Sequence, residues 1–93
     1  MRTIKQTSQF KRDFKRETKG KHRKTLTEGL KSALVLLLNN ATIPDKYFDH
    51  AMIGNWSDHR NCHIKPDLVL IYRLPDDDTL HLVRLGSHSE LSI

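Results

Sequence analysis

The sequence predicts an α+β fold in which an N-terminal strand and a two-helix hairpin pack on a mostly antiparallel sheet of four to five strands. Two observations lead there. Apolar residues in the first half recur at helical spacing, and the second half contains β-rich runs separated by short turns. Ninety-three residues support one hydrophobic core, so we expect a single domain over residues 1–93.

The first half begins with a short predicted strand over residues 2–6, followed by two helices. Ser8 is the expected N-cap of a helix from about Gln9 to Lys19, and Gly20 supplies the stop. A second helix is predicted from about Thr25 to Asn39. Its apolar positions follow the spacing of an amphipathic helix, at Leu26, Leu30, Ala33, Leu34, Leu37 and Leu38.

The second half supplies the sheet that these helices cover. Residues 59–65 alternate, with Asn61 and His63 on a polar face and Cys62 and Ile64 on a core face. Residues 68–74 form a nearly continuous apolar run, which is typical of a central strand buried on both faces. Residues 79–85 form the next strand, and the short turns between these runs require antiparallel neighbours.

Charge is divided unevenly between the two halves. Residues 1–44 carry 11 Lys or Arg and 3 Asp or Glu, whereas residues 45–93 carry 5 and 8. Eight of the basic residues lie between positions 11 and 24. Such a density favours a polyanion, nucleic acid first, although a solvated helix face or an acidic protein partner would also account for it.

Three features of the sequence indicate a cytoplasmic protein with no membrane contact. The sequence has no apolar run of about 18 residues, as a membrane span requires. The first ten residues lack the apolar core of a signal peptide. The single cysteine, Cys62, cannot form an internal disulfide.

Histidines at predicted strand ends form the candidate site. His50, His63 and His88 can be brought together by adjacent antiparallel strands, with Asp67 at the turn beside His63. His22 and His81 are expected to be surface or structural residues, and His59 has no assigned role. The ligand spacing of known metal motifs is missing, and so is a Gly-rich phosphate loop, so we expect neither a metal nor a cofactor.

A basic domain with histidines, a carboxylate and an arginine suits RNA cleavage by the substrate's own 2′-OH. The reaction needs a base for the 2′ proton, an acid for the departing 5′ oxygen and cations for the charged phosphorane. Histidine titrates near neutrality and can serve as either acid or base. Arginine can hold the scissile phosphate through its fork of donors.

Across the chain the residues resemble the YafQ branch of the RelE-type toxins of bacterial toxin–antitoxin pairs. The matching positions are Asp49-His50, Gly54, Trp56, Arg60, His63, Pro66-Asp67, Ile71-Tyr72, Arg84, Gly86 and His88. The resemblance implies a RelE-like fold and a ribosome-dependent, metal-independent endoribonuclease that cuts translated mRNA in the A site.

The resemblance also implies roles for particular residues. His88 would be the general acid, and His50, His63 and Asp67 would supply the base and its orienting partners, in a division left open. Arg84 would contact the phosphate, and Arg60 and Trp56 would also bind substrate. Ribosomal RNA would be held by residues of the first helix: Lys11, Arg12, Lys15 and Arg16.

The implied partners are the ribosome, mRNA and a co-encoded DinJ-like antitoxin, commonly in a heterotetramer. Two positions depart from the relatives: Asn61 stands where some carry an acidic residue, and the terminus Leu91-Ser92-Ile93 lacks the aromatic residue that relatives often place there. Two other functions compete. One is a non-catalytic module that binds RNA or an acidic peptide. The other is a gyrase-directed toxin, against which the three histidines argue.

Overall fold

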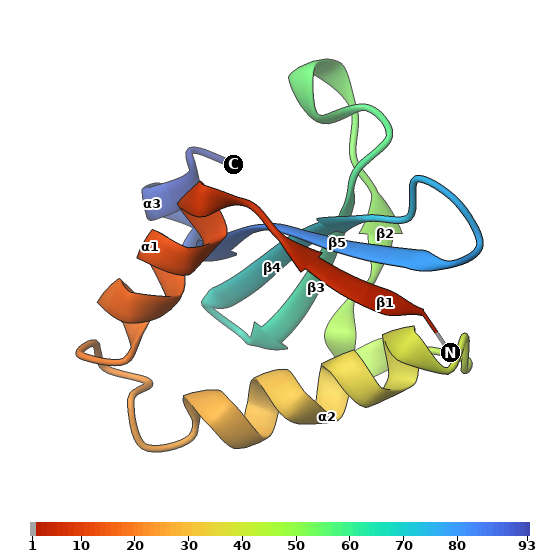
Figure 1. The fold of residues 1–93 in the computed structure, drawn as a ribbon. Helices are drawn as coiled ribbons and strands as arrows, with labels where there is room; N and C mark the ends of the chain where they lie inside the picture. The colour runs from red at the N-terminus through yellow and green to blue at the C-terminus, as the bar shows by residue number, and fades with distance from the viewer. Residues whose placement is uncertain (1) are drawn as a thin grey trace.

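A five-stranded sheet forms the centre of the computed structural model, which describes residues 2–93 (Figure 1). Its strands are β1 (Thr3–Gln6), β2 (His50–Ala51), β3 (Arg60–Lys65), β4 (Leu68–Arg73) and β5 (Thr79–Gly86). They lie in the order β1-β5-β4-β3-β2. β1 pairs with β5 in parallel, and the other neighbours are antiparallel. The mostly antiparallel sheet predicted from the sequence is confirmed.

The two helices predicted from the sequence are present with shifted ends, and a third, short helix that was not predicted follows β5. They are α1 (Ser8–Glu17), α2 (Leu26–Leu38) and α3 (His88–Leu91), and 3₁₀ turns cover Asp45–Tyr47 (η1) and Gly54–Trp56 (η2). The prediction of Ser8 as the N-cap is wrong by one residue. Thr7 takes that place, because its Oγ1 accepts a hydrogen bond from the Phe10 amide at 2.9 Å and donates one to the Val83 carbonyl at 2.7 Å.

Strand β4 is buried on both sides, as its apolar run predicts. Leu68, Leu70 and Tyr72 face α1 and α2, where the main core also takes in Phe10 and Leu30. The alternate residues Val69 and Ile71 face the other side, where Leu91 of α3 and the partly buried Trp56 cover them. The helices α1 and α2 therefore occupy one face, and α3 lies against the end of β5 on the other (Figure 1).

The second cluster corrects one expectation about β3. Cys62 and Ile64 lie in the main core, as predicted. Asn61 was expected on a polar face, but it pairs across the sheet with Ile71 and is only 5% exposed. That face is covered here because Trp56 and Leu91 pack on Ile71. The long connection before β3 and the C-terminal helical turn thus decide which polar groups reach the solvent.

No helix within residues 2–93 is long and apolar enough to span a bilayer.

Candidate active site

The strand register brings His63, Asp67 and His88 to one end of the sheet. His63 of β3 lies opposite Val69 of β4, and Val69 lies opposite Gly86 at the end of β5. Asp67 sits in the turn between β3 and β4, and His88 begins α3 directly after β5. Three consecutive antiparallel strands therefore place these side chains side by side, as the sequence predicts.

Hydrogen bonds join these three side chains in a line. The Nδ1 atom of His88 lies 3.2 Å from Oδ1 of Asp67, and its Nε2 atom lies 3.1 Å from Nε2 of His63. A carboxylate only accepts hydrogen bonds, so Nδ1 of His88 carries a proton. Between the two Nε2 atoms one must donate and the other accept. The two histidines therefore share a single proton at this position, and histidine can serve as either a general acid or a general base.

A short helix fixes the position of His88. Ser87 caps α3, with its Oγ accepting from the Glu90 amide at 3.1 Å, while Glu90 Oε1 accepts from the Ser87 amide at 2.8 Å. This reciprocal pair is a capping box. Leu91 then anchors the turn in the second apolar cluster. The His88 side chain stays 42% exposed, so a bound molecule can reach it.

Asp67 is held as a carboxylate by two neighbours. Hydrogen bonds from His88 and from Lys21 keep the pKa of Asp67 below its usual range. Lys21, from the connection between α1 and α2, lies with its Nζ 3.3 Å from Oδ2. The sequence placed Lys21 in the basic run without a specific role. Only the tertiary structure shows that it reaches the site.

His63 and His50 differ in their surroundings. Burial and the neighbouring His88 lower the pKa of His63, which favours its neutral form. His50 is exposed, and its ring centre lies 6.5 Å from that of His63. Nδ1 of His50 lies 2.6 Å from the Phe48 carbonyl oxygen, which can only accept, so Nδ1 carries a proton. In the neutral ring, Nε2 of His50 is then free to take a proton. The four predicted residues His50, His63, Asp67 and His88 are called the histidine cluster below.

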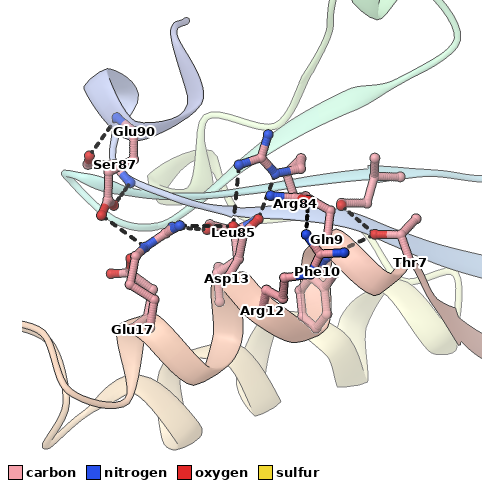
Figure 2. Close-up of polar contacts among 12 residues, drawn as sticks. Thr7, Gln9, Phe10, Arg12, Asp13, Glu17, Arg84, Leu85, Ser87 and Glu90 are labelled. Carbon is pink, nitrogen blue, oxygen red and sulfur yellow. Dashed lines mark hydrogen bonds and ion pairs between the residues drawn. The ribbon is translucent and has the colours of Figure 1, made fainter.

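Arg84 lies in a second polar group, the arginine–carboxylate network of Asp13, Arg16, Glu17, Arg84 and Glu90 (Figure 2). Nε of Arg84 lies 2.7 Å from Oδ2 of Asp13, and the Leu85 amide donates to the same oxygen at 3.0 Å. Burial alone would raise the pKa of Asp13. The contact with Arg84 and the Leu85 amide outweighs it, so this pKa lies below its usual value.

Arg16 joins the same network. Its Nη1 lies 3.0 Å from Oδ1 of Asp13, and its Nη2 donates to the Leu85 carbonyl at 2.9 Å. Its Nε lies 3.0 Å from Glu90. Arg16 and Arg84 thus tie α1 to β5 and α3. Within residues 2–93 neither makes a hydrogen bond or ion pair with the histidine cluster. Their predicted contacts with RNA stay predictions.

The other predicted substrate-binding residues also have partners. Nε of Arg60 donates to Oδ1 of Asp49 at 2.8 Å, and the buried Tyr72 hydroxyl donates to Oδ2 of Asp49. This fixes the segment that carries His50. Trp56 is partly buried in the second apolar cluster, with its ring edge-on to His59 at 5.3 Å. Their binding roles stay predictions.

The predicted RNA-binding residues of α1 fall into two groups. Lys11, Arg12 and Lys15 are exposed, whereas Arg16 is engaged by the network.

Cys62 is 1% exposed, and burial raises the pKa of its thiol to about 12. An inert core cysteine was expected, and its burial is confirmed.

The fold is shared with solved bacterial toxins. YafQ from Escherichia coli strain BL21(DE3) superposes with a TM-score of 0.85 at 35% identity over 98% of both chains. The toxin in the crystal structure of the E. coli DinJ-YafQ complex superposes with a TM-score of 0.83 at 36% identity, again over 98% of both chains. The mRNA interferase toxin YafQ of E. coli strain K12 is 36% identical over 91 residues, covering 97% of this chain and 95% of the relative.

The architecture therefore defines a toxin of the bacterial toxin–antitoxin class. Residues 2–93 match the family described as the bacterial toxin of type II toxin-antitoxin system, YafQ. The chain belongs to that family, and the resemblance drawn from its residues is confirmed.

Proposed function

We propose that this toxin is a ribosome-dependent endoribonuclease that cuts translated mRNA in the A site and so inhibits translation. The observation that carries the proposal is the hydrogen-bonded line His63–His88–Asp67 at an exposed end of the sheet. The relative from E. coli K12 that matches almost the full chain is an mRNA interferase, which supports the same reaction class.

In the proposed reaction the 2′ oxygen of the substrate attacks the adjacent phosphorus, and the bond to the 5′ oxygen breaks. A base takes the 2′ proton, and His88 donates a proton to the departing 5′ oxygen. The products are a 2′,3′-cyclic phosphate and a 5′-hydroxyl end. Histidine supplies both proton transfers, so the proposal requires neither metal nor cofactor.

The base role belongs to the pair His50 and His63. His50 presents Nε2 as an acceptor, and His63 is kept neutral by burial and by His88. Asp67 orients His88 through Nδ1, and its negative charge favours the doubly protonated ring from which His88 donates its proton. Because His63 and His88 share a hydrogen bond, a substitution of either residue also changes the surroundings of the other.

Binding to the ribosome is assigned to α1 and to the arginines near the sheet. Lys11, Arg12 and Lys15 face the solvent and can contact the phosphates of ribosomal RNA. Arg84, Arg60 and Trp56 are proposed substrate contacts. Arg84 and Arg60 would approach the phosphate as members of their ion pairs with Asp13 and Asp49.

A DinJ-like antitoxin is the proposed inhibitor, in a heterotetramer that contains two toxins. The related toxin of E. coli forms a complex with DinJ. The net charge of +5, concentrated in residues 1–44, would suit an acidic antitoxin segment.

Brief expression followed by primer extension on a translated message tests the proposal. We expect new 5′ ends inside the open reading frame, fragments that end in a 2′,3′-cyclic phosphate, and no cleavage of the same message without translation. Salt-sensitive RNA binding without any fragments would instead identify a non-catalytic binding module. Inhibition of supercoiling by gyrase would identify a gyrase-directed toxin.

A further inference from the structure

Phe48 has a conformation that neither packing nor backbone preference explains. The residue is 68% exposed, and its backbone has φ 46° and ψ 40°, in the left-handed region. A bulky residue in this region is under backbone strain, and such strain is concentrated at functional sites. The Phe48 amide donates to Asp45 at 2.9 Å, and its carbonyl oxygen is the partner of His50. The strained position is therefore held from both sides.

The ring of Phe48 stands at the histidine cluster. It meets the His63 ring edge-on, with 5.6 Å between the ring centres. A cavity of about 870 Å³ opens beside it, lined by Phe48, His50, His63, Lys46 and Lys65 among others. This volume is within the range of small-ligand pockets. Lys46 and Lys65 make the cavity basic, and Asp49, its only acidic lining residue within residues 2–93, is paired with Arg60.

We propose that Phe48 is a base-stacking residue, and that the cavity between Phe48, Lys46 and Lys65 holds the RNA nucleotide next to the scissile phosphate. The ring supplies a face for the nucleobase, and the two lysines lie where they can neutralise the flanking phosphate. The neighbouring His50 and His63 then meet the ribose 2′-OH. The inference rests on the proposed endoribonuclease activity for the identity of the ligand.

The stacking contact is tested by variants that separate aromatic character from apolar bulk. Phe48→Leu keeps an apolar side chain without a π-face, Phe48→Trp restores the face, and Ile53→Ala is the matched control. Ile53 is 89% exposed but does not line the cavity. Stacking of one base on an aromatic residue corresponds to roughly a 5- to 150-fold change in affinity.

The binding measurement is an NMR titration with an RNA trinucleotide that carries a 2′-deoxy sugar at the cleaved step and is therefore uncleavable. We expect the amide signals of residues 46–50 and 63–65 to shift in the wild type, Phe48→Trp and Ile53→Ala. The affinity of Phe48→Leu should fall by the factor above. No shift in the wild type, or equal affinity of Phe48→Leu and the wild type, would overturn the inference. So would saturation of the cavity by a polyglutamate peptide but not by the trinucleotide.

Primer extension on translated mRNA separates this inference from the proposed function. If the wild type cuts mRNA but Phe48→Leu binds and cuts equally well, the enzyme assignment stands and the stacking role is wrong. If the trinucleotide binds through Phe48 but no variant cuts translated mRNA, the nucleotide subsite stands and the proposed function is wrong.

Discussion

The histidine cluster and the arginine–carboxylate network are both groups of charged and polar residues that tertiary structure assembles from distant segments, but they differ in what is left free. In the network, Asp13 is completely buried and its oxygens accept from Arg84, Arg16 and the Leu85 amide. In the histidine cluster, Asp67 and His88 keep 47% and 42% of their side chains exposed. The network satisfies its own hydrogen bonds, whereas the cluster leaves proton-transfer groups facing the solvent.

This contrast separates stability from chemistry. A buried carboxylate with three donors resists disruption because removing it leaves those donors unpaired. A histidine pair of which His88 is 42% exposed contributes little to the free energy of unfolding, but it is placed to act on a bound molecule. Substitutions in the network should therefore lower the free energy of unfolding, whereas substitutions in the histidine cluster should lower the rate of mRNA cleavage and leave stability nearly unchanged.

The largest effect is expected for His88→Ala. Losing the general acid should reduce mRNA cleavage by about 10²–10⁴-fold, while the urea midpoint of unfolding stays near that of the wild type. His22→Gln is the matched control, because His22 lies in the connection between α1 and α2, and within residues 2–93 no side-chain hydrogen bond or ion pair joins it to the histidine cluster. Full-rate cleavage by His88→Ala on translating ribosomes would remove His88 from the mechanism.

Asp13→Ala should show the opposite signature. The free energy of unfolding should fall by about 2–3 kcal/mol, because Arg84 and the Leu85 amide lose their acceptor. The value lies at the low end for a buried pair, since the Arg84 and Arg16 side chains are 22% and 40% exposed and water can solvate them. Urea denaturation measures the change. An unchanged midpoint with lost cleavage would place Asp13 in the chemistry.

Arg84→Ala tests whether a residue of the arginine–carboxylate network also takes part in RNA cleavage. We expect a loss of about 1–2 kcal/mol of unfolding free energy, from the broken contact with Asp13. The proposed phosphate contact adds a fall in cleavage of at least about tenfold per folded molecule. Both are measured on the same preparation, by denaturation and by single-turnover cleavage. If cleavage per folded molecule is unchanged, Arg84 belongs to the network alone.

A smaller effect is expected on the exposed side of α1. Lys11→Ala/Lys15→Ala should weaken ribosome binding and reduce the slope of log affinity against log salt by about one for each phosphate contact removed. The free energy of unfolding should change by less than about 0.5 kcal/mol. Lys31→Ala on α2 is the control, since it removes an exposed lysine elsewhere. If Lys31→Ala changes the salt slope equally, the effect comes from the loss of net charge and not from contacts made by α1.

The smallest effect is a pH dependence of stability. The pKa of His63 is lower in the folded chain than in the unfolded one, so the unfolded chain binds more protons between these two values. Stability should therefore fall as the pH drops below about 6.5. His81, whose pKa is also lowered by burial, contributes in the same direction. Urea midpoints at pH 5.5 and 7.5 should differ less in His63→Gln than in the wild type. An identical difference would exclude His63 as a source.

The comparison also shows what could be predicted from the sequence. The apolar run of β4 and the alternation in β3 were enough to place the sheet centre and to bring His63, Asp67 and His88 to one end. The spacing Ser87–Glu90 is a capping-box signature that could have predicted α3, although the expected elements ended at residue 85. Strand β2 is only two residues long and carries no periodicity to detect.

The partners of the arginines could not be predicted from the sequence. Asp13 and Arg84 are 71 positions apart, and only the docking of α1 on β5 makes them neighbours. Likewise Lys21 reaches Asp67 across 46 positions. Phe48 gave no signal, because a single phenylalanine in a connecting segment is usually a packing residue. Its exposure and left-handed backbone become visible only in three dimensions.

Attack by the 2′-OH within the histidine cluster is the central claim, and a message with one altered sugar tests it most directly. Ribosomes are stalled with a 2′-deoxy nucleotide at the position whose 2′ oxygen would attack, and the wild-type toxin is added. The account predicts rapid cleavage of the all-ribose message, with a 2′,3′-cyclic phosphate end, and no cleavage at the substituted step. Cleavage of the 2′-deoxy step at the same rate would contradict it.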